Sequence, residues 1–216
     1  VGGLLVVTGG QGVDGNLVLT TEVFDGTAWT EVAPLPVPRE HLASATDGTY
    51  MYVVGGRVLS SDANLPDLER YDPATDRFRR TGGLPAGDIR ALASDGVDGV
   101  WVGSTAGLAF VDANGRLRRE ATRLPDPLVE ALYLAPEGDL WIGTGDGLVH
   151  RAPDGSTRTF RPDSLGGLGA FRVATLAPSR SGLLVGTFGD GLLSFDPSTG
   201  AFTEVDLGPG FIDQHV

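Results

Sequence analysis

The chain has 216 residues and a formal net charge of −12, with 16 basic residues, all of them arginine, against 28 acidic ones. An acidic balance of this size argues against a general nucleic-acid binder or a binder of anionic membranes. There is no cysteine, which excludes disulfides, thiolate metal sites and cysteine nucleophiles. No apolar run approaches the ~20 residues that span a bilayer.

Short apolar runs separated by Gly, Pro, Asp and Asn predict strands along the whole chain. Residues 1–35 contain three such runs, Leu4–Thr8, Leu19–Phe24 and Trp29–Val32. Each later segment contains four, which are His41–Ala45, Tyr50–Val54, Leu68–Tyr71 and Phe78–Thr81; Ile89–Ala93, Val100–Val102, Leu108–Val111 and Leu117–Glu120; Val129–Leu134, Leu140–Ile142, Leu148–Arg151 and Thr157–Phe160; Val173–Ala177, Leu183–Val185, Leu192–Phe195 and Phe202–Val205.

One hairpin pattern recurs. Leu140–Leu148 reads L-W-I-G-T-G-D-G-L, and related stretches occur at Val100–Leu108 and Leu183–Leu192. A spacing of about forty residues in an all-β pattern is typical of propeller blades. We therefore predict an all-β fold, a five-bladed β-propeller of four-stranded antiparallel blades.

The predicted propeller is a single domain over residues 1–216. Its blades are residues 1–35 plus 211–216, 39–84, 88–121, 128–160 and 171–205. The first blade has only three strands, and Phe211–Val216 is a lone candidate strand at the far end of the chain. We expect this tail to complete the first blade and close the ring, because closure hides two sheet edges that would otherwise be exposed.

Residues 1–84 resemble kelch repeats. The features that carry the resemblance are Gly55-Gly56, Tyr71, Phe78 and the Pro38-Arg39 lead in the second copy, and Gly9-Gly10, Phe24 and Trp29 in the first. The resemblance implies propeller blades and leaves the activity open, because propellers host many functions.

Residues 88–205 resemble the propeller repeat of two-component regulators. The matching residues are Asp95, Gly99, Trp101 and Gly103-Ser104; Trp141, Gly143-Thr144 and Gly147-Leu148; and Gly186-Thr187, Gly191-Leu192 and Phe195-Asp196-Pro197. Trp101 and Trp141 share one repeat position, so we expect both to be buried between adjacent blades. A kelch half joined to a regulator-type half is either a natural mosaic or an engineered chimera.

Two local motifs are better explained as turns than as ligand sites. Gly10–Gly15 spells G-x-G-x-x-G after a strand, but the β-like segment Leu17–Thr21 follows instead of the helix that a dinucleotide site needs. The acidic turns at Asp95 and Asp112 lack the spacing and the closing glutamate of an EF-hand. Asp and Asn favour such turns on their own account.

The first strand of each propeller blade lines the central axis, so polar residues at the starts of these strands predict a funnel. Arg39 and Glu40 lie there, and the loops on the same face add hydroxyls and carboxylates. The candidate ligand-binding residues are His41, Arg90, Glu130, Arg172, His215, Thr144, Asp146, Thr187 and Asp190. Mixed charges and hydroxyls suit a small polar ligand, a glycan or a peptide; the alternative is a solvated rim without a ligand.

These observations favour a non-enzymatic binding or scaffold module, either sensor-type or engineered. We expect a monomer with no cofactor, no metal, and no nucleic-acid or membrane partner, and the compartment stays open. The alternative is a carbohydrate-active enzyme, a lyase or glycosidase, acting at the funnel. Its carboxylate pair would come from Glu40, Glu130, Asp146 and Asp190.

Overall fold

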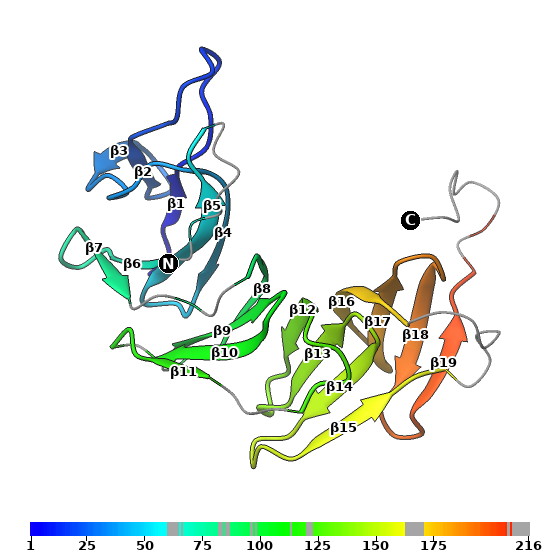
Figure 1. Ribbon diagram of the computed structural model, residues 1–216. Coiled ribbons are helices and arrows are strands. Elements are labelled where there is room, and N and C mark those ends of the chain that lie inside the picture. Colours follow the sequence, from blue (N-terminus) through cyan, green and yellow to red (C-terminus); the bar gives the residue numbers. More distant parts are fainter. Residues whose placement is uncertain are drawn as a thin grey trace. The chain divides into compact units, whose positions relative to one another are not determined.

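The computed structural model describes residues 1–59, 65, 67–81, 84, 87–95, 97, 99–112, 114–119, 123–162, 171–206 and 208. This part of the chain forms nineteen β-strands in five antiparallel sheets and contains no helix (Figure 1). A membrane-spanning helix is accordingly not found among these residues. The chain divides into two compact units, Val1–Val102 with Ala109–Glu120, and Gly103–Leu108 with Ala121–Val216.

The first sheet has three strands, as predicted. They are β1 (Leu5–Thr8), β2 (Thr21–Phe24) and β3 (Trp29–Val32), hydrogen-bonded in the order β1-β2-β3. Within the described residues β1 therefore pairs on one side only. The tail Phe211–Val216, predicted to complete this sheet, lies outside the described residues.

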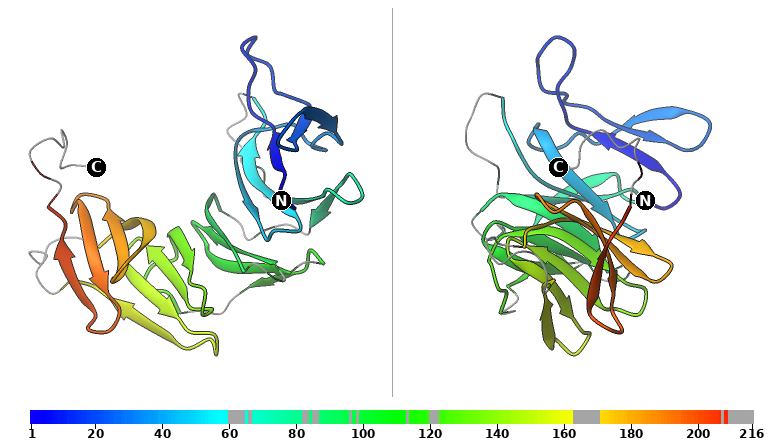
Figure 2. Two further views of the ribbon diagram at one scale, coloured as in Figure 1. Left: turned by 180° about the vertical axis from the view of Figure 1, so that it is seen from behind. Right: turned by 90° about the vertical axis from the view of Figure 1, so that its right-hand side faces the viewer.

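The other four sheets each have four strands. The second contains β4 (Glu40–Thr46), β5 (Met51–Arg57), β6 (Leu68–Asp72) and β7 (Arg77–Thr81), and the third contains β8 (Ile89–Ser94), β9 (Gly99–Ser104), β10 (Gly107–Asp112) and β11 (Leu117–Arg119). The fourth contains β12 (Val129–Leu134), β13 (Leu140–Thr144), β14 (Gly147–Arg151) and β15 (Thr157–Phe160). The fifth contains β16 (Val173–Ser179), β17 (Gly182–Thr187), β18 (Leu192–Asp196) and β19 (Ala201–Glu204). Neighbours in each sheet follow one another in the chain, as the views in Figure 2 show.

Every strand predicted in the described residues is present, and most differences are extensions at the hairpins. The predicted strand Leu140–Ile142 runs on to Thr144, because Gly143 pairs with Leu148 and Thr144 pairs with Gly147. The connection then needs only the two residues 145 and 146, which is the commonest length for a β-hairpin loop.

Apolar side chains between successive sheets form the cores. The second strands β5, β9 and β13 are buried almost throughout, which is expected of strands covered on both faces. In the first unit one cluster joins Val23 and Val53 between the first two sheets, and another joins Val54 and Val102 between the second and third. In the second unit a cluster around Trp141 joins the fourth and fifth sheets. Within each unit the sheets thus pack face to face, as propeller blades do.

Candidate functional site

Two predicted ligand-binding residues meet in the first unit. His41 of β4 and Arg90 of β8 line one pocket of about 150 Å³. The pocket is completed by Gly55, Gly56, Leu65, Gly87, Asp88 and Ile89. The first strands of neighbouring sheets lie side by side here, so residues that are far apart in sequence line the same pocket.

The local backbone presents the His41 side chain to solvent. His41 has a positive φ of 54°, which is uncommon for a residue other than glycine. Its side chain is 68% exposed, and its Nδ1 lies 3.7 Å from Oε1 of Glu40, beyond hydrogen-bond distance. Glu40 itself accepts a hydrogen bond of 3.0 Å from Nε of Arg57. The imidazole therefore keeps hydrogen-bonding capacity for a ligand.

Arg90 contributes a cationic group to the same pocket. Its side chain is 46% exposed, and its Nη2 lies 3.8 Å from Oδ2 of Asp88. That separation is too long for a direct hydrogen bond, so guanidinium donors stay available. Together, His41 and Arg90 suit a ligand that offers acceptor oxygens.

In the second unit the structure pairs two other predicted residues. Nη2 of Arg172 donates to Oε1 of Glu130 at 2.7 Å. Glu130 lies where the register between β12 and β13 shifts, from Val129 with Thr144 to Ala131 with Gly143. Such a bulge re-aims the side chain of the extra residue. Both residues were predicted to contact a ligand. They use part of their hydrogen-bonding capacity on each other instead.

Arg172 is held by further contacts. Its guanidinium carbon lies 4.6 Å from the ring centre of Phe188, a cation–π arrangement. Its Nε is buried and has no hydrogen-bond partner among the described residues.

The predicted hydroxyls Thr144 and Thr187 are used inside their own hairpins. Thr144 Oγ1 donates to the carbonyl of Gly147 at 2.8 Å and accepts from the backbone N–H of Asp146 at 3.2 Å. Thr187 repeats this with Gly191 at 2.9 Å and Asp190 at 3.0 Å. The hydroxyl of the repeated Gly-Thr pair therefore closes the turn, and both threonine side chains are buried.

Replacing Thr144 with valine is expected to lower the free energy of unfolding by about 1–3 kcal/mol, because a buried carbonyl and a backbone N–H lose their partner. Thr157→Val, at an exposed position of β15, is the matched control and should change stability little. Chemical denaturation followed by circular dichroism measures both. Equal midpoints for the two variants would contradict the turn-closing role.

The remaining predicted site residues are dispersed. Asp146 accepts hydrogen bonds from Arg161 Nε at 3.1 Å and Nη2 at 2.5 Å, and a longer one from the backbone N–H of Phe171. Asp190 is exposed. His215 lies outside the described residues. Within the described ranges, no three His, Asp or Glu side chains gather where they could hold a metal ion.

The structure also confirms the two turn predictions. In the G-x-G-x-x-G loop, Gly12 N–H donates to the carbonyl of Asn16 at 2.8 Å, and Gln11 forms an isolated bridge with Leu17. Asp95 Oδ1 accepts the backbone N–H of Gly99, and Asp112 Oδ1 accepts that of Arg116. These carboxylates stabilise their own turns, as expected of Asp in this position.

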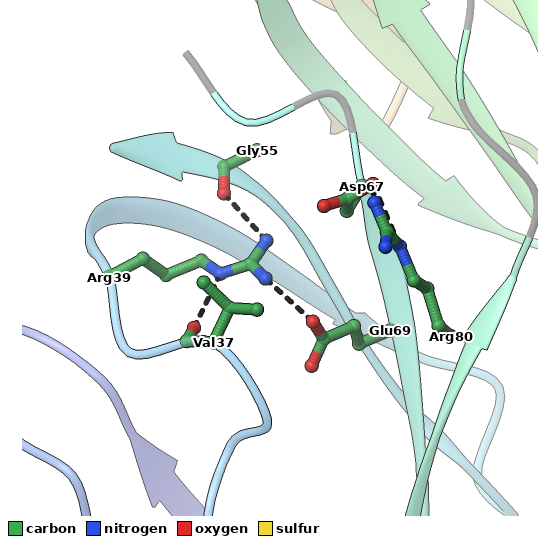
Figure 3. Close-up of polar contacts among 6 residues, drawn as sticks. All are labelled: Val37, Arg39, Gly55, Asp67, Glu69 and Arg80. Atoms are coloured by element: carbon green, nitrogen blue, oxygen red, sulfur yellow. Dashed lines mark hydrogen bonds and ion pairs between the residues drawn. The ribbon is translucent and has the colours of Figure 1, made fainter. Parts of the chain in front are cut away.

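Arg39, which the sequence placed at the start of an inner strand, is part of the core of the second sheet (Figure 3). Its guanidinium donates to the carbonyls of Val37 at 3.0 Å and Gly55 at 3.1 Å, and to Oε1 of Glu69 at 2.6 Å. Burial raises the pKa of the Glu69 carboxyl, while the Arg39 charge opposes that shift. Beside this pair, Arg80 binds Asp67.

A larger pocket in the second unit was missed by the sequence analysis. It measures about 550 Å³ and contains none of the predicted ligand-binding residues. Its polar groups include Asp139, His150, Arg158 and Ser179. His150 is one of three histidines scattered along the sequence, and nothing around it singled it out. The feature that could have identified it is its cross-strand pairing with Trp141 and Arg158.

Comparison with known proteins identifies part of this fold. The family model of the Kelch motif matches residues 38–85, the stretch that holds the second sheet and the Arg39 network. This stretch is similar to a kelch motif. An F-box/kelch-repeat protein of Arabidopsis thaliana is 37% identical over 57 residues, which cover 26% of this chain and 15% of that protein. The kelch resemblance predicted for the N-terminal half is thus confirmed over the kelch motif.

Solved structures are similar over nearly the whole chain. The extracellular domain of a putative one component system from B. thetaiotaomicron matches with a TM-score of 0.65 and 20% identity, covering 94% of this chain and 28% of that one. The corresponding domain of a putative hybrid two component system from the same organism gives 0.61 and 21%, covering 92% and 29%. Virginiamycin B lyase from Staphylococcus aureus gives 0.63 and 13%, covering 95% and 75%. At these identities the likeness shows the fold, and it confirms the propeller class.

Proposed function

We propose that the protein is a non-enzymatic binding module of the propeller class that takes a polar ligand at the starts of its inner strands. The observation that carries this proposal is the pocket where His41 and Arg90 meet from two neighbouring sheets. The similarity to extracellular domains of regulatory systems supports a sensor-type role. The kelch motif supports a binding role as well.

The chemistry of the pocket suggests the ligand class. An imidazole and a guanidinium without close internal acceptors favour a small ligand, glycan or peptide that presents oxygen acceptors. Arginine also recognises carboxylates in a bidentate manner. We therefore expect ligands that carry a carboxylate or several carbonyl or hydroxyl oxygens to bind best.

The contacts of the candidate carboxylates give less support to the alternative, a carbohydrate-active enzyme. Glycoside hydrolysis needs two carboxyl groups, one of which donates a proton. Glu40, Glu130 and Asp146, three of the four candidates, each accept from an arginine, namely Arg57, Arg172 and Arg161. These pairings are typical of carboxylates that act as acceptors, which is why we favour binding over catalysis.

The double variant His41→Ala/Arg90→Ala is expected to weaken ligand binding by at least about 100-fold, because hydrogen bonds that involve a charged group contribute about 1.5–3 kcal/mol each. Arg180→Ala, at an exposed arginine of the fifth sheet, is the control. Calorimetric titration with a panel of acidic sugars, neutral glycans and short peptides measures the effect. Turnover of any glycan, or binding of an acidic sugar or a peptide that the double variant leaves intact, would count against the proposal.

We also propose that residues 1–216 act as one domain, with Phe211–Val216 pairing beside β1. Deleting residues 209–216 is then expected to lower the free energy of unfolding by several kcal/mol, since each lost backbone hydrogen bond costs about 1 kcal/mol and each buried apolar side chain about 2 kcal/mol. An unpaired β1 edge should also promote association. Denaturation and size-exclusion chromatography test this; a truncated protein that stays monomeric with the parent's midpoint would contradict it.

A further inference from the structure

We propose that the pocket between the fourth and fifth sheets is a second binding site and that its ligand is a neutral carbohydrate. The pocket measures about 550 Å³, within the roughly 300–1,000 Å³ of small-molecule sites. It lies wholly in the second unit and shares no residue with the His41 pocket. The inference is therefore independent of the proposed function.

One wall of the pocket is a row of side chains across the fourth sheet. Tyr133 of β12 pairs with Trp141 of β13, Trp141 with His150 of β14, and His150 with Arg158 of β15. Directly paired residues lie on the same face of a sheet, and all four line the pocket. The row places two aromatic rings, an imidazole and a guanidinium along one surface.

The imidazole in this row has a defined orientation. Nε2 of His150 lies 2.6 Å from Oδ1 of Asp139. This contact occupies Nε2 and leaves Nδ1 as the ring nitrogen for other contacts. The His150 ring also packs on Trp141, with ring centres 4.7 Å apart. A hydrogen-bonding group is thus held in place beside an aromatic surface.

The guanidinium at the end of the row is positioned in a similar way. The Arg158 guanidinium carbon lies 4.5 Å from the ring centre of Phe160. A cation–π contact uses the face of the guanidinium group and leaves the N–H donors at its edge free to bind a ligand. Arg158 thus offers several donors in a fixed plane.

The fifth sheet supplies the opposite wall. Pro178, Leu183 and Pro197 give it an apolar surface. Among them, Oγ of Ser179 is buried and has no hydrogen-bond partner in the described residues. A buried hydroxyl without a partner is costly, and a hydroxyl of a bound ligand would satisfy it.

The balance of these groups selects the ligand class. Glu137, Asp139, His150 and Arg158 line one pocket, so donors and acceptors are both present, and carboxylates lie in the same pocket as a guanidinium. A negatively charged ligand would leave the carboxylates desolvated without a counter-charge, and a positively charged ligand would do the same to the guanidinium. A neutral sugar fits, because its hydroxyls both donate and accept and its C–H faces can pack on the aromatic and proline side chains.

The test is a titration of the full chain with the neutral disaccharides maltose, cellobiose and lactose, using glucuronate and arginine as charged comparators. Ser179→Ala and Arg158→Ala are each expected to weaken disaccharide binding about tenfold or more. Arg118→Ala is the matched control, because Arg118 lies 5.0 Å over the Phe110 ring of the third sheet. Its affinity should equal the parent's, and none of the three variants should unfold at a lower denaturant concentration than the parent.

Several outcomes would overturn the inference. These are no disaccharide binding by the parent, tighter binding of glucuronate or arginine than of disaccharide once His41→Ala/Arg90→Ala has removed the first site, or affinity unchanged by both pocket variants. The double variant His41→Ala/Arg90→Ala should leave disaccharide binding at the second site unchanged. A loss of binding in that variant alone would assign the ligand to the inner-strand pocket instead.

Discussion

Replacing Trp141 with alanine is expected to lower the free energy of unfolding by about 3–5 kcal/mol. The indole is only 7% exposed and belongs to the core between the fourth and fifth sheets. Its ring meets the edge of Phe195 at 5.4 Å between ring centres and lies 6.1 Å from that of Phe160. Truncation would remove these contacts and leave a cavity that rigid strands on both sides cannot close.

Trp29 provides the matched control for this prediction. It lies at the start of β3 and is 52% exposed, and among the described residues its one ring contact is with Phe24, at 5.1 Å. Trp29→Ala should therefore change stability by about 1 kcal/mol or less. Denaturant titrations followed by far-ultraviolet circular dichroism compare the two variants. If Trp141→Ala unfolds at the same denaturant concentration as Trp29→Ala, the packing between the fourth and fifth sheets is not what stabilises this unit.

Replacing Glu69 with alanine is expected to cost about 3–5 kcal/mol, because it leaves the Arg39 guanidinium buried without its counter-charge. The two side chains are 0% and 1% exposed and 2.6 Å apart. The carbonyls of Val37 and Gly55 also accept from Arg39, but they cannot neutralise its charge. The effect should therefore exceed that of removing an exposed glutamate such as Glu22.

A double variant separates loss of the charge pair from loss of packing. Arg39→Met/Glu69→Leu replaces both ions by apolar side chains of similar volume, and such replacements are often neutral or stabilising. We expect it to recover most of the stability lost in Glu69→Ala, as measured by chemical denaturation against Glu22→Ala. A double variant that is less stable than Glu69→Ala would show that the polar network is needed for the second sheet to pack.

The strands were predictable from the sequence because their signals are local. Alternating apolar residues and the turns at Asp112 and Asp196 act within a few positions. Trp29–Val32, Val129–Leu134 and Thr157–Phe160 agree with the structure to the residue. The burial of Trp101 and Trp141 followed from their shared repeat position. The repeat and its hairpins thus determine both the all-β fold and the burial of the two tryptophans.

The partners of the polar side chains were decided only by tertiary structure. Arg39 lies thirty positions from Glu69, and Arg172 forty-two from Glu130. No local pattern encodes these pairings, because they depend on how strands register and how sheets stack. Thr144 and Thr187 instead bond within their own hairpins, three and four positions away. His41 and Arg90 are far apart in the sequence and line one pocket because two sheets pack side by side. Sequence determined which residues are strands and turns, and packing decided which polar groups remain free to bind.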